Sequence, residues 1–224
     1  MRQIPLAIGL GPEPGFENFQ SGRNDLVLEV LSHWREPGPP IYLHGPAGSG
    51  KSHLIAALAG LVRELGGRTG WFDADSPLPW TFDEGWTLIV IDQAERLDPA
   101  RQHAAFTLFV EAAPHGTQVL GAGRLPPVDL PVREDLRTRF GWGPVYELQA
   151  LDEAGTRAVL RREAEARGIL LAEDVMDYLM TRFARDLGSL KGLLHRLDRF
   201  SLAEKRAITV PLLKRMLAEG EVAA

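Results

Sequence analysis

The sequence contains no cysteine. Disulfides, zinc sites with thiolate ligands and thiol nucleophiles are therefore excluded, and the composition fits a reducing compartment. No apolar run approaches the roughly 18 residues that cross a membrane. The first ten residues also lack the charged leader and small-residue cleavage site of a secretory signal. We therefore expect a cytoplasmic protein with no membrane partner.

An excess of positive charge is also missing. The chain has 25 Lys and Arg against 30 Asp and Glu, which gives a formal net charge of −5. Free-standing duplex-DNA binders are usually basic, because neutralising phosphates drives their association. We therefore expect no direct sequence-specific DNA binding. The 224 residues, 45% of them hydrophobic, suffice for one or two ordinary globular domains.

A glycine-rich stretch has the spacing of a phosphate-binding loop: Gly45-Pro46-Ala47-Gly48-Ser49-Gly50-Lys51-Ser52. It follows an apolar run at 40–44 and precedes a helix-forming segment at 53–59, which is the strand–loop–helix context that the motif requires. Glycines let several N–H groups converge on an anion, and the helix start adds donors and a favourable dipole. We expect Lys51 to reach the outer phosphates and the Ser52 hydroxyl to coordinate Mg²⁺. Residues 45–52 are thus predicted to bind ATP or ADP.

A second informative stretch, 87–92, is a continuous apolar run ending in Asp92. Such a run predicts a buried parallel strand, and ligands of open α/β sheets lie beyond the carboxyl ends of strands. Asp92 is therefore predicted to bind Mg²⁺ together with Ser52. Gln93 follows, where many ATPases have a glutamate base. An amide cannot accept a proton, so we expect slow intrinsic hydrolysis, and we interpret Glu95 as a surface residue.

The chain has a longer part in which strands and helices alternate, followed by a shorter part that is all helical. Strands are predicted at 41–44, about 69–73, 87–92, 118–122 and 145–148, with helices between them. This alternation predicts an α/β fold with a mainly parallel five-stranded sheet and helices on both faces. Apolar spacing after 149 predicts four helices that begin near 152, 172, 187 and 209. We expect an arm at 1–15, an αβα nucleotide-binding domain at 16–148 and a small all-helical lid domain at 149–224.

Three further local patterns occur in the sequence. Asn24 and Asp25 form a plausible N-cap pair. The arginines at 157, 161, 162 and 167 are interpreted as solvated. The arm segment Gln3-Ile4-Pro5-Leu6-Ala7-Ile8 has apolar side chains at alternate positions, which would share one face of an extended segment. Either the arm packs on its own domain, or it inserts into the groove of a partner as a short linear motif.

These features together resemble AAA+ ATPases of the DnaA type. The resemblance is carried by the loop at 45–52, Asp92, the segment Arg137-Thr138-Arg139-Phe140-Gly141-Trp142-Gly143 and the helical tail. The segment 16–19 is similar to the opening of that module, where the adenine is enclosed. The helix-turn-helix domain of bacterial DnaA has no counterpart here. The arm resembles the motif that docks on the sliding clamp, so the whole chain is similar to the Hda family of DnaA-homologous regulatory inactivators.

That resemblance implies an ADP-bound protein with little or no ATPase activity of its own. It would dock through residues 3–8 on the sliding clamp (the beta subunit of DNA polymerase III). It would then stimulate hydrolysis of DnaA-bound ATP and so prevent re-initiation of chromosome replication. Arg139 matches the arginine finger of the family, acting in trans. The sequence is compatible with a homodimer.

The chain departs from the family pattern at two nucleotide-sensing positions. The sensor-2 arginine falls on Gly188, with Arg185 and Lys191 as alternative substitutes, and the sensor-1 residue falls on Gly123. Both changes suit a nucleotide that is kept as a structural clamp. The alternative function is that of an independent AAA+ ATPase, such as a helicase loader or a DNA-remodelling factor.

Overall fold

The computed structural model describes residues 13–183 and 187–221. The predicted clamp-binding segment at 3–8 lies outside these ranges. The described chain divides into a sheet unit, Pro14–Ala150, and a helical unit that begins at Leu151. Among the described residues, no helix has the length and apolar character needed to cross a membrane.

The sheet unit contains five strands in the order β2-β3-β4-β1-β5, and all four neighbouring pairs are parallel. This confirms the predicted α/β fold. The strands are β1 (Ile41–His44), β2 (Thr69–Phe72), β3 (Leu88–Ile91), β4 (Gln118–Gly123) and β5 (Val145–Glu147). Because every strand runs in the same direction, their carboxyl ends share one edge, where His44 stands opposite both Gly123 and Glu147.

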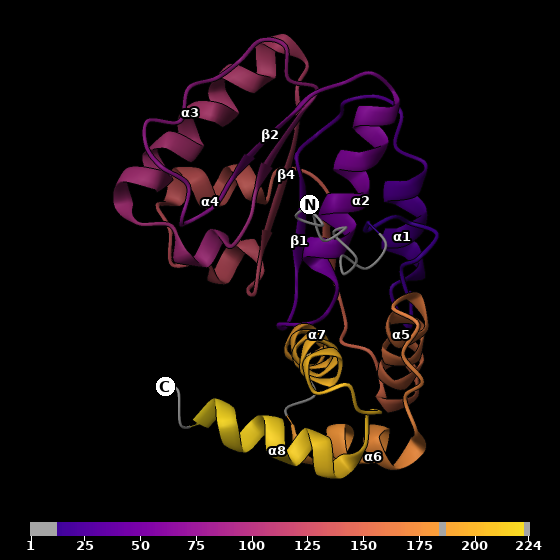
Figure 1. Ribbon diagram of the computed structural model, residues 1–224. Coiled ribbons are helices and arrows are strands. Elements are labelled where there is room, and N and C mark those ends of the chain that lie inside the picture. The colour runs from indigo at the N-terminus through magenta and orange to yellow at the C-terminus, as the bar shows by residue number, and fades with distance from the viewer. Residues whose placement is uncertain (1–12, 184–186, 222–224) are drawn as a thin grey trace, which may run out of the picture. The chain divides into compact units, whose positions relative to one another are not determined.

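Helices cover both faces of the sheet (Figure 1). One face carries α1 (Asp25–Ser32) and α2 (Lys51–Glu64), and the other carries α3 (Pro99–His115) and α4 (Glu134–Phe140). Short 3₁₀ turns span Ala94–Arg96 and Pro127–Asp129.

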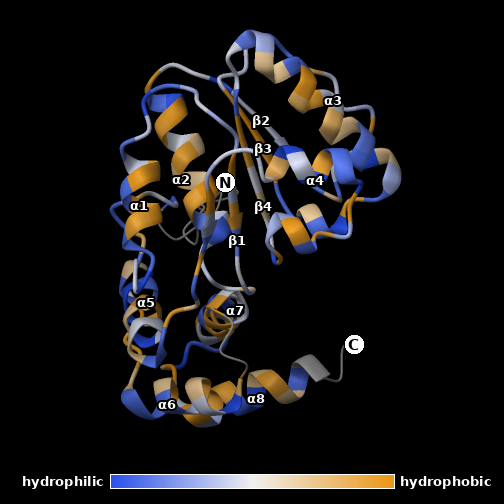
Figure 2. Cartoon of the chain, turned by 180° about the vertical axis from the view of Figure 1, so that it is seen from behind, coloured by the Kyte–Doolittle hydropathy of each residue, from blue (hydrophilic) through white to orange (hydrophobic). Residues whose placement is uncertain are grey.

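Alternation along β1 builds a core on each face of the sheet. Leu43 packs with the α2 side, and Tyr42 packs with the α3 and α4 side. The apolar strands between the two helical layers appear in Figure 2.

The helical unit consists of α5 (Glu153–Ala166), α6 (Glu173–Arg182), α7 (Leu187–Glu204) and α8 (Val210–Glu221). Its helices begin where the sequence predicts. The Asp152 carboxylate caps α5 by accepting the N–H of Gly155 at 2.7 Å. Leucines at helical spacing on α7, such as Leu190 and Leu197, are buried in the core of this unit.

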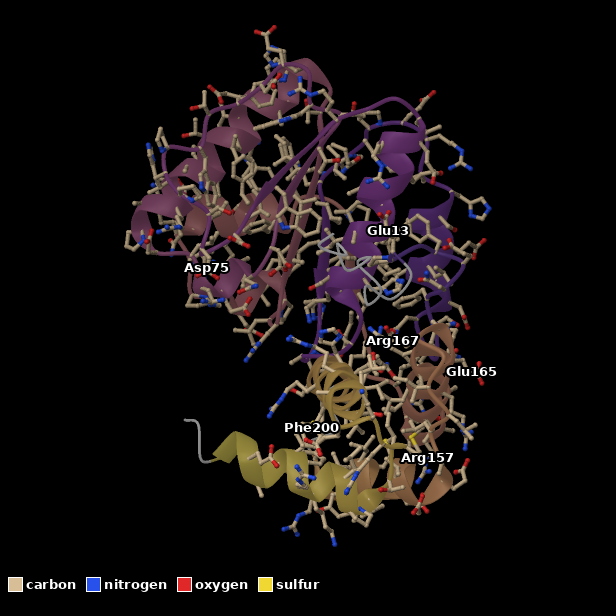
Figure 3. The ribbon with its side chains drawn as sticks, viewed as in Figure 1. Glu13, Asp75, Arg157, Glu165, Arg167 and Phe200 are labelled. Carbon is tan, nitrogen blue, oxygen red and sulfur yellow. The ribbon has the colours of Figure 1, made fainter. Side chains whose placement is uncertain are left out.

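Two of the arginines on this unit are not solvated as predicted. Arg157, near the start of α5, is only 22% exposed and lies 2.7 Å from the Asp177 carboxylate. Arg167, at the end of α5, is 11% exposed and pairs with Glu163 (Figure 3). Long arginine side chains can pack their apolar stems against a protein surface while their charged ends form ion pairs with carboxylates, as both of these do. The prediction treated the run as a uniform charged face, which is wrong for these two residues.

Asn24 also behaves differently from the prediction, because its side chain makes no capping bond to α1. Its amide nitrogen donates to the Gln149 carbonyl at 2.9 Å, and its amide oxygen accepts the Gln149 N–H at 2.8 Å. Asn24 is buried. It therefore bridges the start of the sheet unit to the segment that follows β5.

We expect Asn24→Ala to destabilise the protein by about 1–3 kcal/mol, because it removes two part-buried hydrogen bonds to the Gln149 backbone, each worth about 0.5–1.5 kcal/mol. Urea unfolding followed by circular dichroism measures this. The control is Asp25→Ala on the exposed first turn of α1, where a lost interaction with the helix dipole costs only about 0.3–1 kcal/mol. Equal effects of the two substitutions would contradict the bridging role.

Candidate nucleotide-binding site

The loop at 45–52 joins the end of β1 directly to the start of α2, in the predicted order. Gly45, Gly48 and Gly50 have φ values of 146°, 75° and 99°, which side chains rarely tolerate. At Gly45 a Cβ atom would also lie 2.1 Å from the carbonyl oxygen of Leu148, just beyond β5. The curvature of the loop therefore depends on glycine, both for its dihedral angles and for a close backbone approach.

The Lys51 ammonium lies within this loop. It donates to the carbonyl oxygens of Gly45 at 2.7 Å and Pro46 at 2.8 Å, and to the Ser49 hydroxyl at 3.4 Å. Burial lowers the pKa of Lys51, while Asp92 and Glu95 act in the opposite direction. The loop thus holds a positive charge at its centre, where an anion cradled by the backbone N–H groups would meet it.

Asp92 follows the last residue of β3 and is 7% exposed. Its Oδ1 accepts the Gln93 N–H at 2.7 Å. Burial raises the pKa of Asp92, against the lowering effects of that hydrogen bond and of Lys51. Ser52, the other predicted Mg²⁺ ligand, lies in the first turn of α2 and is exposed. The carboxylate is thus at the carboxyl edge of the sheet, as its strand predicts.

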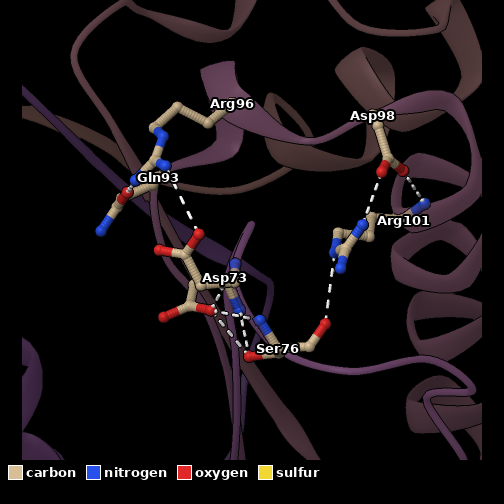
Figure 4. Close-up of polar contacts among 7 residues, drawn as sticks. Asp73, Ser76, Gln93, Arg96, Asp98 and Arg101 are labelled. Carbon is tan, nitrogen blue, oxygen red and sulfur yellow. Dashed lines mark hydrogen bonds and ion pairs between the residues drawn. The ribbon is translucent and has the colours of Figure 1, made fainter.

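Gln93 is held by a neighbouring arginine. Its backbone is left-handed, with φ of 53°, and its side-chain oxygen accepts from Arg96. Arg96, which lies beside Gln93 in Figure 4, is also 3.5 Å from the Asp75 carboxylate in the loop after β2. The side chain at the usual position of the catalytic base is therefore an amide that is already engaged by Arg96.

Glu95 is a residue of this edge that the sequence interpretation missed. Its side chain is 16% exposed, and its Oε2 accepts the backbone N–H of Arg124 at 3.1 Å. The 3₁₀ turn at Ala94–Arg96 directs it towards the end of β4. The expectation of a surface residue is therefore wrong. A usable signal was the pair Gly121 and Gly123, which leaves the second half of one face of β4 without side chains.

Aromatic residues lie at the start of α2. The Phe19 ring packs 5.3 Å from the ring of His53, and a Cβ on Gly50 would come within 2.6 Å of Phe19. Phe16 and Phe19 also pack against the core on this face of the sheet. The segment predicted to enclose a nucleotide base therefore lies beside the loop.

Arg139 lies at the opposite edge of the sheet. Its guanidinium carbon is 4.9 Å from the centre of the Trp142 ring and 5.8 Å from that of Phe106. Arg139 and Trp142 line a cavity of about 240 Å³ whose walls include Pro40 and Thr117, the residues that precede β1 and β4. The length of β1, about 13 Å for four residues, therefore separates this edge from the phosphate loop.

Of the two alternative substitutes for the sensor-2 arginine, Arg185 and Lys191, the structure describes only Lys191. Gly188 lies in the first turn of α7, and Arg185 falls outside the described residues. The Lys191 ammonium lies 3.1 Å from the Glu163 carboxylate, which Arg167 also contacts. Burial raises the pKa of Glu163, but these two cations lower it overall. Lys191 is thus engaged within the helical unit.

Residues 152–217 match a family model described as the lid domain of Hda. Domain III of the replication initiation protein DnaA from Thermotoga maritima has a TM-score of 0.76 and 22% sequence identity, and the match covers 94% of this chain and 98% of that one. AMPPCP-bound DnaA from Aquifex aeolicus has a TM-score of 0.67 and 22% identity over 86% and 67% of the two chains.

The same fold occurs in the RuvB Holliday junction branch migration motor of T. maritima. Its TM-score is 0.63, with 17% identity over 87% of this chain and 66% of that one. These structural likenesses establish the AAA+ fold, and the family match covers the helical unit. The chain therefore has the fold of DnaA domain III, and its helical unit is similar to the lid domain of Hda.

Proposed function

We propose that this protein is a regulatory inactivator of DnaA. It binds ADP, docks through residues 3–8 on the sliding clamp of DNA polymerase III, and stimulates hydrolysis of the ATP held by DnaA. Re-initiation of chromosome replication is thereby prevented. The observation that carries this proposal is the position of Arg139 relative to the phosphate loop of its own chain.

The position of Arg139 supports a role on another molecule. It lies at the sheet edge opposite its own phosphate loop, half-buried between two aromatic rings. Within the described ranges, no carboxylate forms an ion pair with it. Its charge therefore cannot stabilise its own nucleotide. A partner whose nucleotide edge met this surface would receive a guanidinium that aromatic packing has already oriented.

The nucleotide of the chain itself serves as a structural clamp. Lys51 and the loop N–H groups hold its phosphates, and Ser52 and Asp92 hold Mg²⁺. In the described part of the chain, no group of three or more His, Asp and Glu side chains could hold a metal. Phosphate and water oxygens must therefore complete the Mg²⁺ shell, which is the usual situation for this cation. The engaged Gln93 supports weak intrinsic hydrolysis.

Arg139→Ala should abolish the stimulation of DnaA while leaving nucleotide binding intact. The assay follows labelled ATP preloaded on DnaA, with this protein and clamp-loaded DNA present. We expect the stimulated rate to fall by roughly 10³-fold, the lower end of known arginine-finger contributions. Arg133→Ala is the matched control, because Arg133 also contacts Phe106, at 5.9 Å, but pairs with Asp135.

Retained stimulation in the Arg139 variant would place the finger elsewhere. Fast turnover of its own ATP by the wild-type protein, in the absence of DnaA, would instead favour the independent AAA+ ATPase.

The double substitution Gln3→Ala and Leu6→Ala should abolish binding to the sliding clamp. It removes the polar anchor and one apolar residue of the alternating segment that would enter a groove on the clamp. Co-elution of the two purified proteins in gel filtration measures this. The Arg139→Ala protein serves as the control and should still co-elute. Undiminished binding of the double variant would show that the arm is not the docking segment.

Asp92→Asn should stabilise the nucleotide-free protein at pH 7 and weaken binding of Mg²⁺-nucleotide. The folded protein raises the pKa of Asp92 above the unfolded value of about 3.9, because the carboxylate is buried. Ionisation therefore costs stability once the pH rises through that window, and the amide avoids this cost. Urea unfolding from pH 3 to 7 should show the two proteins diverging as pH rises. A less stable variant at pH 7 would contradict the prediction.

A further inference from the structure

A buried hydroxyl near the phosphate loop has no assigned role. Tyr42 on β1 is completely buried, with its ring 5.1 Å from that of Phe140. Its hydroxyl oxygen has no hydrogen-bond partner among the described residues. A buried polar atom without a partner weakens a fold, so its presence calls for an explanation.

The hydroxyl points to the end of β4, where Glu95 is also directed. A Cβ on Gly123 would lie 2.3 Å from the Tyr42 oxygen and 2.8 Å from Glu95 Oε2. Both oxygens therefore approach a position that only glycine leaves open. They make no direct hydrogen bond, but they are close enough for one water molecule to bridge them. Gly121 completes this space, because a Cβ there would lie 2.7 Å from the Tyr42 ring.

This cluster lies next to the phosphate loop. Gly123 stands opposite His44, the residue that leads into the loop. The charge of Glu95 also acts on both Lys51 and Asp92. The nearest cation to Glu95 is Arg124, whose Nε is 3.6 Å away but whose side chain is 67% exposed. The carboxylate is therefore only partly neutralised.

The orientation of a bound nucleotide follows from the ends of the site. The aromatic residues Phe19 and His53 lie beside the start of α2, where they would contact the base. The acidic residues Asp92 and Glu95 lie beyond the ends of β3 and beside the end of β4. A phosphate chain that runs away from the base across Lys51 would extend towards these acids. Each further phosphate would bring more negative charge towards Glu95.

We propose that Glu95 determines nucleotide preference: its carboxylate, held inward by the Arg124 N–H and facing the Tyr42 hydroxyl across a space for one bridging water, disfavours a third phosphate relative to a diphosphate. Glu95 is the specificity-determining residue, and Tyr42 is a positioning residue. The inference rests on the proposed nucleotide site and names what selects ADP there. Like charges in a partly buried site repel each other more strongly than in bulk water.

The test compares the dissociation constants of ADP and a non-hydrolysable ATP analogue, measured calorimetrically with Mg²⁺ on the full chain. In Glu95→Gln, the ratio of the analogue constant to the ADP constant should fall about tenfold, or about 1.4 kcal/mol. Glu84→Gln is the control, since that carboxylate is 82% exposed and precedes β3 at the opposite edge. Its ratio should equal that of the wild type.

Tyr42→Phe separates positioning from packing. It should shift the same ratio in the same direction without lowering the melting temperature, because the hydroxyl lacks a protein partner. An unchanged ratio in Glu95→Gln, or an equal loss of both nucleotides, would overturn the role of Glu95.

Different results would overturn the proposed function. A wild-type protein that binds neither nucleotide would overturn the nucleotide site and this inference together. A wild-type preference for ATP, with the ratio still falling in Glu95→Gln, would overturn only the ADP state and support the role of Glu95.

Discussion

The pairing of β1 with β4 and β5 is the interaction on which both candidate functional edges of the sheet unit depend. The Tyr42 N–H donates to the Pro144 carbonyl at 2.9 Å, and the His44 carbonyl accepts the Leu148 N–H at 2.6 Å. The second of these bonds fixes the backbone against which Gly45 begins the phosphate loop. The first fixes the segment between α4 and β5, next to the cavity that Arg139 lines. One strand of four residues thus sets the distance between a nucleotide site and an arginine.

The electrostatics of the carboxyl edge oppose stability in the absence of a ligand. Burial disfavours the charged forms of both Lys51 and Asp92, and Glu95 adds a further negative charge. Carbonyl oxygens of the loop accept hydrogen bonds from the Lys51 ammonium and so take the place of phosphate oxygens. Such a site is held ready by the surrounding fold and gains its missing partners on binding. This is why the same substitution of Asp92 can strengthen the empty protein and weaken its complex.

The sequence revealed the features whose causes are local. The apolar run before Asp92 and the glycine spacing at 45–50 predict a strand and a loop because neighbouring residues alone dictate them. The partners of Asn24 could not be predicted, since Gln149 lies 125 residues away in the chain. Glu95 and Arg167 were misread for the same reason: charge and sequence neighbourhood suggest solvent, and only packing shows a partner. Gly121 and Gly123 were a visible clue, because two alternate glycines in a strand indicate that something large lies across it.

The separation of the two edges also constrains how the proposed complex is built. A nucleotide edge and an arginine edge on opposite ends of a sheet cannot be satisfied by a two-fold contact that uses one patch twice. They require a head-to-tail contact, in which the Arg139 surface of one molecule meets the nucleotide edge of the next. Head-to-tail contacts add molecule after molecule unless one of the two edges cannot bind the next molecule. The nucleotide edge of this chain is different, because it has an engaged amide at Gln93, a carboxylate at Glu95 and no side chain at Gly123. Under the proposed function, this protein therefore gives its arginine to DnaA and has little need of one in return.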